Sequence, residues 1–355
     1  MNKYWRVSIV AAILIFAALA ILIRLHIYSP KDLNFSNKFS AQQDEGALQN
    51  QLNPLSIEFM RKQQYPGSDL TIEQKLSDKE NYHQYIASYI SEGLKIYALL
   101  TVPADQKPQN GWPVIIFNHG YIPPDQYQTT EKYLAYVDGF AKNGYIVFKP
   151  DYRGNGKSEG QPLGAYYSPA YTIDVLNALS SVKSFKDADQ AKIGMWGHSM
   201  GGNITLRALV VSSDIKAAVI WSGVVGTYDD LANRWRRSSP FQPSLREQLS
   251  SRPTRQKLID QYGSLSQNPD FWHSIDPRYF LQNISAPIQL HHGLADQTVP
   301  WEFSQGLRDD LEKAGKVVEY YTYEGANHNL SQPFNLAMRR SQEFFDKYLK
   351  GGGKQ

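Results

Sequence analysis

A short glycine-rich segment, Gly-His-Ser-Met-Gly at residues 197–201, constrains this chain more than any other feature of its sequence. It follows a short apolar run and leads into residues 200–211, whose pattern predicts a helix. Its two glycines leave room for a strand and a helix to pass close to Ser199, whose backbone is strained by a sharp turn. The segment therefore predicts a strand, a tight turn and a helix that lift the Ser199 hydroxyl clear of a sheet.

The predicted helix would direct its free N–H groups and the positive end of its dipole at Ser199. Negative charge develops at such a position during acyl transfer to a serine. A glycine-rich turn with an incidental serine is the alternative interpretation, because a five-residue pattern with two free positions recurs by chance. The rest of the chain must decide between the two.

Short apolar runs alternate with helix-patterned segments over most of the chain. The apolar runs are residues 114–117, 145–148, 192–196, 217–221, 287–290 and 317–321. Helical patterning falls at residues 131–143, 169–185, 200–211, 301–313 and 332–349. Such runs are typical of central parallel strands, because both of their faces are covered. The alternation predicts an α/β fold, with a doubly wound, mostly parallel sheet and helices on both faces.

Two segments depart from this alternation. Residues 84–90 and 94–102 are extended runs joined by a Ser-Glu-Gly turn, which predicts a hairpin at an antiparallel edge of the sheet. Between Gly226 and Pro287 no strand pattern is found, over a stretch far longer than the usual connection of about 2–6 residues. We expect a helical cap at about residues 227–283, inserted before the strand at 287–290. Its apolar residues are Phe241, Leu258, Tyr262, Phe271, Trp272, Tyr279 and Phe280.

Composition limits the partners and cofactors. The chain has 355 residues and no cysteine, which excludes disulfides, cysteine-ligated zinc and a thiol nucleophile. The formal net charge is +3, without a long run of one sign, so no nucleic-acid partner is expected. Residues 149–160 resemble a phosphate loop, but their glycine spacing does not fit one. We expect a structural turn there, with Asp151 and Arg153 bonding the neighbouring backbone, and no metal or cofactor.

Residues 7–23 are almost unbroken apolar sequence with basic residues on both sides. Extended by their aromatic and aliphatic neighbours, they approach the ~20 residues that a membrane-spanning helix needs. We predict an N-terminal membrane anchor at residues 1–28, a flexible tether at 29–53 and a folded domain at 54–350. The basic N-terminal flank favours a catalytic domain outside the cytoplasmic membrane, periplasmic or extracellular. A cleaved signal peptide is the alternative and would give a secreted protein.

A serine hydroxyl becomes a nucleophile when a base takes its proton, and that base needs a third group to orient it. In folds with this turn, the carboxylate and then the histidine follow the serine, on loops after later strands. Asp296 follows the run at 287–290, and His328 follows the run at 317–321. We predict Ser199 as nucleophile, His328 as general base and Asp296 as the orienting acid.

Other titratable residues are weaker candidates for these roles: His119, His198, His291, His292, Asp276 and Glu302. The histidine beside the serine is expected to point elsewhere and to pack. Those that close strands are expected to hydrogen-bond neighbouring loops. Neither Asp276 nor Glu302 lies in the turn directly after the strand predicted at residues 287–290.

The developing oxyanion needs two preorganised N–H donors. The backbone N–H of Met200 follows from the geometry of the turn. We assign the second donor to the N–H of Tyr121, in the loop 118–121 after the first central strand. Gly120 would let this backbone approach the substrate closely.

From about residue 54 to residue 349 the chain resembles an α/β-hydrolase, and it is similar to the catalytic domain of the prolyl oligopeptidase family of serine peptidases. The motifs that carry the resemblance lie at residues 118–120, 151–156, 197–202, 292–296 and 325–328. The resemblance implies an eight-stranded sheet and the triad named above. Peptidases of the family usually carry a β-propeller ahead of the catalytic domain, and the stretch before the first hairpin is too short to form one.

Together these features predict a serine hydrolase that acts on carboxylic esters or on small peptides or amides through an acyl-enzyme. A carboxylesterase, lipase or dienelactone-type hydrolase without peptidase activity is the alternative, because the turn and the triad are shared by these enzymes. An acyltransferase and an inactive binding protein are further alternatives.

Overall fold

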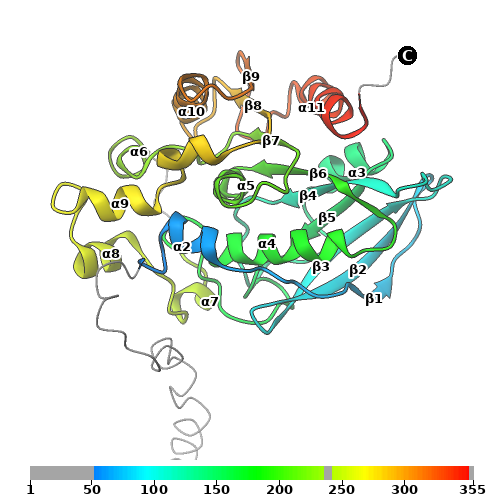
Figure 1. Cartoon of the computed structure of the whole chain (residues 1–355), viewed down its shortest axis with the longest axis horizontal. Coiled ribbons are helices and arrows are strands. Elements are labelled where there is room, and N and C mark those ends of the chain that lie inside the picture. Colours follow the sequence, from blue (N-terminus) through cyan, green and yellow to red (C-terminus); the bar gives the residue numbers. More distant parts are fainter. Residues whose placement is uncertain (1–51, 236–241, 352–355) are drawn as a thin grey trace, which may run out of the picture. The chain divides into compact units, whose positions relative to one another are not determined.

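The computed structural model describes residues 52–235 and 242–351 (Figure 1). The predicted anchor, and the predicted tether up to residue 51, lie outside this part of the chain. None of the helices in the described ranges is long and apolar enough to cross a membrane.

A nine-stranded sheet runs through the described residues, in the order β1, β2, β3, β5, β4, β6, β7, β8, β9. The strands are β1 (Thr71–Lys75), β2 (Tyr82–Ser91), β3 (Leu94–Pro103), β4 (Trp112–Asn118), β5 (Ile146–Pro150), β6 (Ala188–His198), β7 (Ala217–Trp221), β8 (Ile288–Gly293) and β9 (Val318–Tyr323). The first three strands pair antiparallel, as does β3 with β5, and all pairs from β5 to β9 are parallel. The predicted α/β fold with a mostly parallel sheet is confirmed.

The strand count differs from the eight implied by the family resemblance. The predicted hairpin is present as β2 and β3, which pair from Tyr82 opposite Pro103 to Ser91 opposite Leu94. The additional strand, β1, pairs antiparallel with β2, and all five of its residues are exposed. Because β1 buries no face, its sequence has no apolar pattern from which a strand could be predicted.

Helices cover both faces of the sheet (Figure 1). One face packs against α2 (Ile57–Lys62), α4 (Ala170–Lys183), α5 (Met200–Val211) and α10 (Glu302–Lys313). The other face packs against α3 (Leu134–Ala141) and α11 (Phe334–Leu349). Alternate residues of β6 serve the two cores, with Met195 on the first face and Trp196 on the second. Because both faces are buried, the strand reads as a continuous apolar run.

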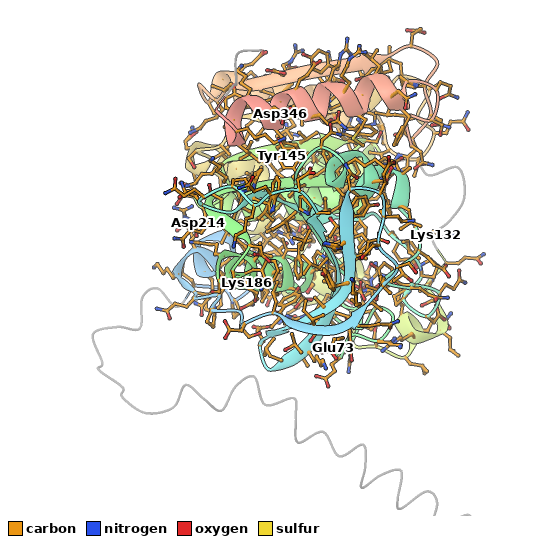
Figure 2. The ribbon with its side chains drawn as sticks, turned by 90° about the vertical axis from the view of Figure 1, so that its right-hand side faces the viewer. Glu73, Lys132, Tyr145, Lys186, Asp214 and Asp346 are labelled. Atoms are coloured by element: carbon orange, nitrogen blue, oxygen red, sulfur yellow. The ribbon has the colours of Figure 1, made fainter. Side chains whose placement is uncertain are left out.

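A hydrogen bond ties α11 to the start of β5. The Tyr145 hydroxyl donates to the Asp346 carboxylate at 2.6 Å, and the two residues lie close together in Figure 2. Tyr145 itself is fully buried. The final helix is therefore held by a polar contact as well as by its apolar face.

The segment between β7 and β8 contains helices and, among its described residues, no strand. Its elements are α6 (Tyr228–Asn233), α7 (Leu245–Gln248), α8 (Arg255–Tyr262), α9 (Pro269–Ile275) and the 3₁₀ helix η2 (Pro277–Asn283). A small apolar cluster holds it together, and Leu258, Phe271 and Trp272 are buried there as expected. Tyr279 departs from the expectation, because it is 54% exposed and stacks on His273.

Candidate active site

Ser199 occupies the sharp turn between β6 and α5. Its backbone dihedrals are φ 55° and ψ −119°, a region that a non-glycine residue adopts only when its surroundings enforce it. Its N–H donates to the Trp221 carbonyl at 3.1 Å, and its own carbonyl accepts from the N–H groups of Gly202 and Val224, each at 3.0 Å. The sharp turn predicted at Ser199 is therefore present, and three backbone hydrogen bonds hold it.

The loop after β4 crosses directly over this turn. A Cβ atom on Gly201 would lie 1.9 Å from the Asn118 carbonyl oxygen, so no side chain fits there. A Cβ atom on Gly120 would lie 3.2 Å from Ser199 Cβ. The loop predicted to supply an oxyanion donor is therefore adjacent to the serine. The Met200 N–H is the first of α5, where helix N–H groups have no intrahelical acceptor.

Asp296 and His328 lie together, on the loops after β8 and β9. His328 Nδ1 is 2.7 Å from Asp296 Oδ2. Because a carboxylate can only accept, Nδ1 carries a ring proton, and in the neutral ring Nε2 then has the lone pair. This is the tautomer that a general base requires. Within the described part of the chain, no hydrogen bond joins the Ser199 hydroxyl to the His328 ring.

The Asp296 carboxylate is fully buried and held by four donors. Oδ1 accepts from the N–H groups of Thr298 (2.8 Å) and Val299 (3.0 Å), and Oδ2 accepts from His328 and from His292 Nε2 (3.1 Å). Burial by itself would raise the pKa of Asp296, but the histidine hydrogen bonds outweigh it and hold the pKa well below its usual value. The carboxylate therefore stays ionised at neutral pH.

His292 hydrogen-bonds the loop after β8, as expected for a histidine at a strand end, but its partner there, the Asp296 carboxylate, was not predicted. Its Nδ1 lies 2.7 Å from the Ser304 hydroxyl of α10, which fixes the ring while Nε2 faces Asp296. Its ring is buried, so it has no access to a substrate. The i, i+4 spacing of His292 and Asp296 across a strand end was the available signal.

His198 is buried beside the serine and contacts the His328 ring at a centroid distance of 4.6 Å. The prediction for His198 was a packing role alone. Both of its ring nitrogens also have hydrogen-bond partners, so the residue does more than pack. Burial, aided by the nearby His328 ring, lowers the pKa of His198 to about 3. The ring is therefore neutral at physiological pH.

The Tyr121 side chain connects the loop after β4 to the segment between β7 and β8. Its hydroxyl donates to Glu247 Oε2 at 2.7 Å. Glu247 is buried in α7 and forms an ion pair with Arg252. Neither Glu247 nor Arg252 was singled out in the sequence, because an isolated Glu and Arg in a polar segment carry no pattern.

Aromatic rings and buried charges support the same loop from behind. The His119 ring stacks between Tyr127 and Tyr152, at centroid distances of 4.6 and 4.3 Å. Tyr127 also donates to Asp151 (2.9 Å) and accepts from Lys149 (3.1 Å). Burial raises the pKa of Asp151 to about 7 and lowers the pKa of Lys149 to about 8.

The loop at 149–160 differs from the prediction in its partners. The carboxylate of Asp151 accepts from the side chains of Tyr127 and Thr129, and the guanidinium of Arg153 pairs with Asp174 of α4. These contacts are to distant side chains and not to the neighbouring backbone. The expected structural turn is present, but it is held by a buried ion pair.

Asp276 and His291 have structural partners other than His328. Asp276 is buried and accepts from the backbone N–H groups of Arg278 and Tyr228, each at 2.9 Å. Burial raises the pKa of Asp276 to about 6. His291 hydrogen-bonds Tyr323 of β9 and Gln289 of β8, which lie in strands and not in the neighbouring loop that was expected. Glu302 begins α10.

The sequence profile of the prolyl oligopeptidase family matches residues 131–352, more than half of the chain. The chain belongs to this family. An uncharacterized peptidase of Bacillus subtilis, YtmA, is 24% identical over 71% of this chain and 88% of its own length. Human dipeptidyl peptidase 8 is also 24% identical, over 68% of this chain but only 25% of its own length.

Solved structures agree on the fold. Acetyl xylan esterase from Paenibacillus sp. R4 aligns with a TM-score of 0.61 at 18% identity, over 82% of this chain and 92% of that one. Acylaminoacyl peptidase of Pyrococcus horikoshii aligns with a TM-score of 0.56 at 21% identity, over 76% of this chain and 41% of that one. This family member has the α/β-hydrolase fold and is a serine hydrolase.

Proposed function

We propose that Ser199, His328 and Asp296 form the catalytic triad of this hydrolase, and that it cleaves carboxylic esters or small peptides or amides through an acyl-enzyme. The N–H groups of Met200 and Tyr121 stabilise the oxyanion. The observation that carries the proposal is the Asp296–His328 contact of 2.7 Å beside a serine in a strained turn. Strained non-glycine backbone of this kind is concentrated at active sites.

In the first half of the reaction, Ser199 Oγ attacks the substrate carbonyl carbon while His328 Nε2 takes the hydroxyl proton. Asp296 remains ionised and stabilises the imidazolium that forms. The tetrahedral intermediate collapses to the acyl-enzyme when His328 returns the proton to the departing alcohol or amine. Water then repeats the sequence on the ester carbonyl and releases the acid and free Ser199.

The serine and histidine are not directly hydrogen-bonded in the described part of the chain, and this is compatible with the mechanism. Catalytic hydrogen bonds are often long in free enzymes and tighten when substrate binds. The two side chains that must be fixed beforehand, Asp296 and His328, already are. Each backbone oxyanion donor is expected to contribute about 10²–10³-fold in rate.

Replacement of the nucleophile tests the proposal. Ser199→Ala should abolish turnover of p-nitrophenyl acetate and labelling by a fluorophosphonate probe, with unchanged circular dichroism. Ser213→Ala is the matched control, because Ser213 is an exposed serine just beyond the other end of α5. It should keep full activity. Turnover retained in the Ser199 variant would falsify the assignment.

The same enzyme preparation separates the substrate classes. A rate screen of acyl-chain esters against aminoacyl and prolyl amides measures esterase and peptidase activity side by side. Turnover of esters alone identifies the carboxylesterase alternative, and turnover of amides identifies a peptidase. Added alcohol as a competing acyl acceptor detects an acyltransferase. A protein that the fluorophosphonate probe does not label, and that cleaves neither esters nor amides, would be a binding protein.

We further propose that residues 7–23 anchor the protein in the cytoplasmic membrane, with the hydrolase domain on its outer side. The support is the length of the apolar run and its basic N-terminal flank. Removal of residues 1–28 should release active enzyme into the soluble fraction. Activity that stays in the membrane fraction after this deletion would contradict the anchor.

A further inference from the structure

A chain of hydrogen bonds joins the loop after β4, the turn at Ser199 and the loop that carries His328. The Gly120 N–H donates to the Tyr133 hydroxyl (2.9 Å), which lies 2.8 Å from His198 Nδ1. On the other side of the same ring, His198 Nε2 lies 3.1 Å from the His328 carbonyl oxygen. The chain therefore reaches the three segments of the proposed oxyanion donor, nucleophile and base.

The donors and acceptors in this chain have only one consistent order. The His328 carbonyl can only accept, so His198 Nε2 carries the proton. The neutral ring carries only that proton, so Nδ1 has a lone pair and accepts a hydrogen bond from the Tyr133 hydroxyl. The hydroxyl oxygen then uses a lone pair for the Gly120 N–H. A side chain that exchanges the donor and acceptor positions cannot replace Tyr133 or His198 in this series of hydrogen bonds.

The backbone of Tyr133 shows that its position is enforced. Lys132 (φ 47°) and Tyr133 (φ 58°) both adopt left-handed backbone, which is unfavourable for residues with a Cβ atom. Tyr133 is the N-cap of α3, yet its side chain makes no capping hydrogen bond. Its ring instead packs edge-on against the His198 ring at 5.6 Å. The costly conformation is thus explained by contacts at the site and not by helix capping.

Gly120 is the point where these residues meet. A Cβ atom there would lie 2.5 Å from the Tyr133 hydroxyl and 3.3 Å from His198 Nδ1, in addition to its close approach to Ser199. Glycine is the most flexible residue, and it directly precedes the peptide whose N–H belongs to Tyr121. The hydrogen bond to Tyr133 removes that freedom at the place where an oxyanion donor must be fixed.

We propose that Tyr133 and His198 are positioning residues, which hold the loop at Gly120 and the loop at His328 in place around Ser199 by one directional hydrogen-bond chain. This inference rests on the proposed function. The neutral His198 ring also adds no positive charge next to His328 when that residue becomes an imidazolium. Neither positioning residue exchanges a proton with the substrate.

Loss of the Tyr133 hydroxyl should affect the transition state more than the bound substrate. Without it, the Gly120 N–H and His198 Nδ1 lose their shared partner. The peptide that carries the Tyr121 N–H is then held less firmly, by the contact of His119 Nδ1 with the Gly120 carbonyl (2.7 Å). Oxyanion donors act mainly on charge that develops during the reaction. The rate constant kcat should therefore fall while KM changes little.

The test uses Tyr133→Phe with p-nitrophenyl acetate, after active sites are counted by fluorophosphonate titration. We expect kcat per active site to fall about 10- to 100-fold, with KM within about threefold of wild type. Counting active sites removes the effect of a partly misfolded sample, which would lower the active fraction and leave kcat per site unchanged.

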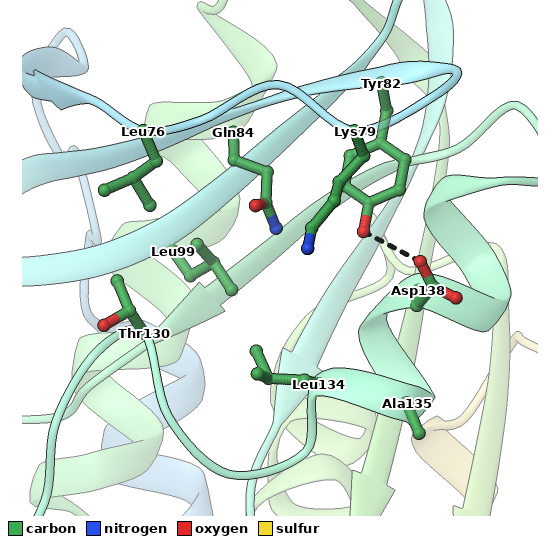
Figure 3. Close-up of a pocket in the computed structure, with 9 residues that line it drawn as sticks. All are labelled: Leu76, Lys79, Tyr82, Gln84, Leu99, Thr130, Leu134, Ala135 and Asp138. Atoms are coloured by element: carbon green, nitrogen blue, oxygen red, sulfur yellow. Dashed lines mark hydrogen bonds between the residues drawn. The ribbon is translucent and has the colours of Figure 1, made fainter.

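Tyr82→Phe is the matched control. The Tyr82 hydroxyl donates to Asp138 at 2.9 Å, so it anchors the same helix, α3. It does so at a surface pocket of about 440 Å3 that contains none of the proposed catalytic residues (Figure 3). This variant should keep the wild-type kcat, which separates the hydroxyl at the site from general support of α3.

A second variant approaches the chain from its other end. In His198→Asn the side-chain oxygen retains an acceptor near Nδ1, but no donor reaches the His328 carbonyl. We expect a fall in kcat, and a smaller loss in the double variant with Tyr133→Phe than the product of the two single losses, because the residues act in one network. This variant also tests the proposal if Tyr133→Phe does not fold.

The outcomes separate this inference from the proposed function. An active wild type whose Tyr133→Phe variant stays within about twofold in kcat overturns the positioning role alone. Losses that multiply independently in the double variant overturn it as well. A wild type that neither turns over the ester nor labels at Ser199 refutes the proposed function, and this inference with it.

Discussion

Replacement of Arg153 by methionine should destabilise the protein by about 3–5 kcal/mol, because it removes one partner of a buried ion pair. The Arg153 guanidinium contacts the fully buried Asp174 carboxylate through Nη2 (2.7 Å) and Nε (3.1 Å). Two charge-assisted hydrogen bonds of about 1.5–3 kcal/mol each give a similar total. After the change, the donors that Asp174 keeps among residues 52–235 and 242–351 are both neutral, the Ser91 hydroxyl and the backbone N–H of residue 153.

Equilibrium unfolding in urea measures this loss, with the buried Trp196 and Trp221 as fluorescence probes. Arg153→Met should lower the midpoint by about 1 M or more, given a slope of about 3 kcal/mol per M. Arg234→Met is the matched control, because its ion pair with Asp230 has a similar length of 2.9 Å but Arg234 is 56% exposed. That variant should lose less than about 1 kcal/mol.

A further variant isolates the charge. Arg153→Met combined with Asp174→Asn should be more stable than Arg153→Met alone, because the buried carboxylate is then neutral while an acceptor remains. Equal losses in Arg153→Met and Arg234→Met would refute the reasoning, since burial is the feature that distinguishes the two pairs. So would a double variant that is less stable than the single one.

Two more predictions follow from close packing and from burial. Gly201→Ala should abolish turnover of p-nitrophenyl acetate, because the alanine Cβ would lie 1.9 Å from the Asn118 carbonyl oxygen. Gly306→Ala is the control and should keep its activity in the same assay, because the nearest atom to its Cβ would lie 3.5 Å away. Burial raises the pKa of Asp276 to about 6, so the folded protein binds a proton at this carboxyl more tightly than the unfolded chain does. The stability that this proton contributes is lost as pH rises from about 4, the unfolded value, through 6. Between pH 5 and 8 the wild type should therefore lose about 1.4 kcal/mol more than Asp276→Asn in urea unfolding; equal losses would contradict the assignment.

The sequence was most informative where one residue type had one structural consequence. The apolar run of β6 and the glycines around Ser199 predicted the strand, turn and helix, because a buried strand needs apolar residues on both faces and a close crossing needs glycine. The order of serine, acid and histidine led to Asp296 and His328, which the structure brings to 2.7 Å. Their catalytic roles stay predictions.

The sequence was least informative where side chains from distant segments meet. Tyr133 was not predicted because an aromatic residue inside a helix-patterned segment is ordinary, and its contact with His198 depends on two left-handed residues that no pattern shows. His198 was assigned to packing because it lies beside Ser199 in the turn, and no pattern reveals its two hydrogen-bond partners, which are distant along the chain. The exposed strand β1 was missed because pairing with β2 needs no apolar residues.

The long segment between β7 and β8 leaves the sheet at one strand and returns at its immediate neighbour, since Ala218 pairs with Ile288. Its length is therefore independent of strand register, and the cost of closing such a loop grows only slowly with length. Insertions or deletions there would change the segment that contacts Tyr121 through Glu247, while β7 and β8 beneath it keep their pairing. We expect exchange of this surface segment to alter substrate preference more than it alters the strands that carry the proposed triad.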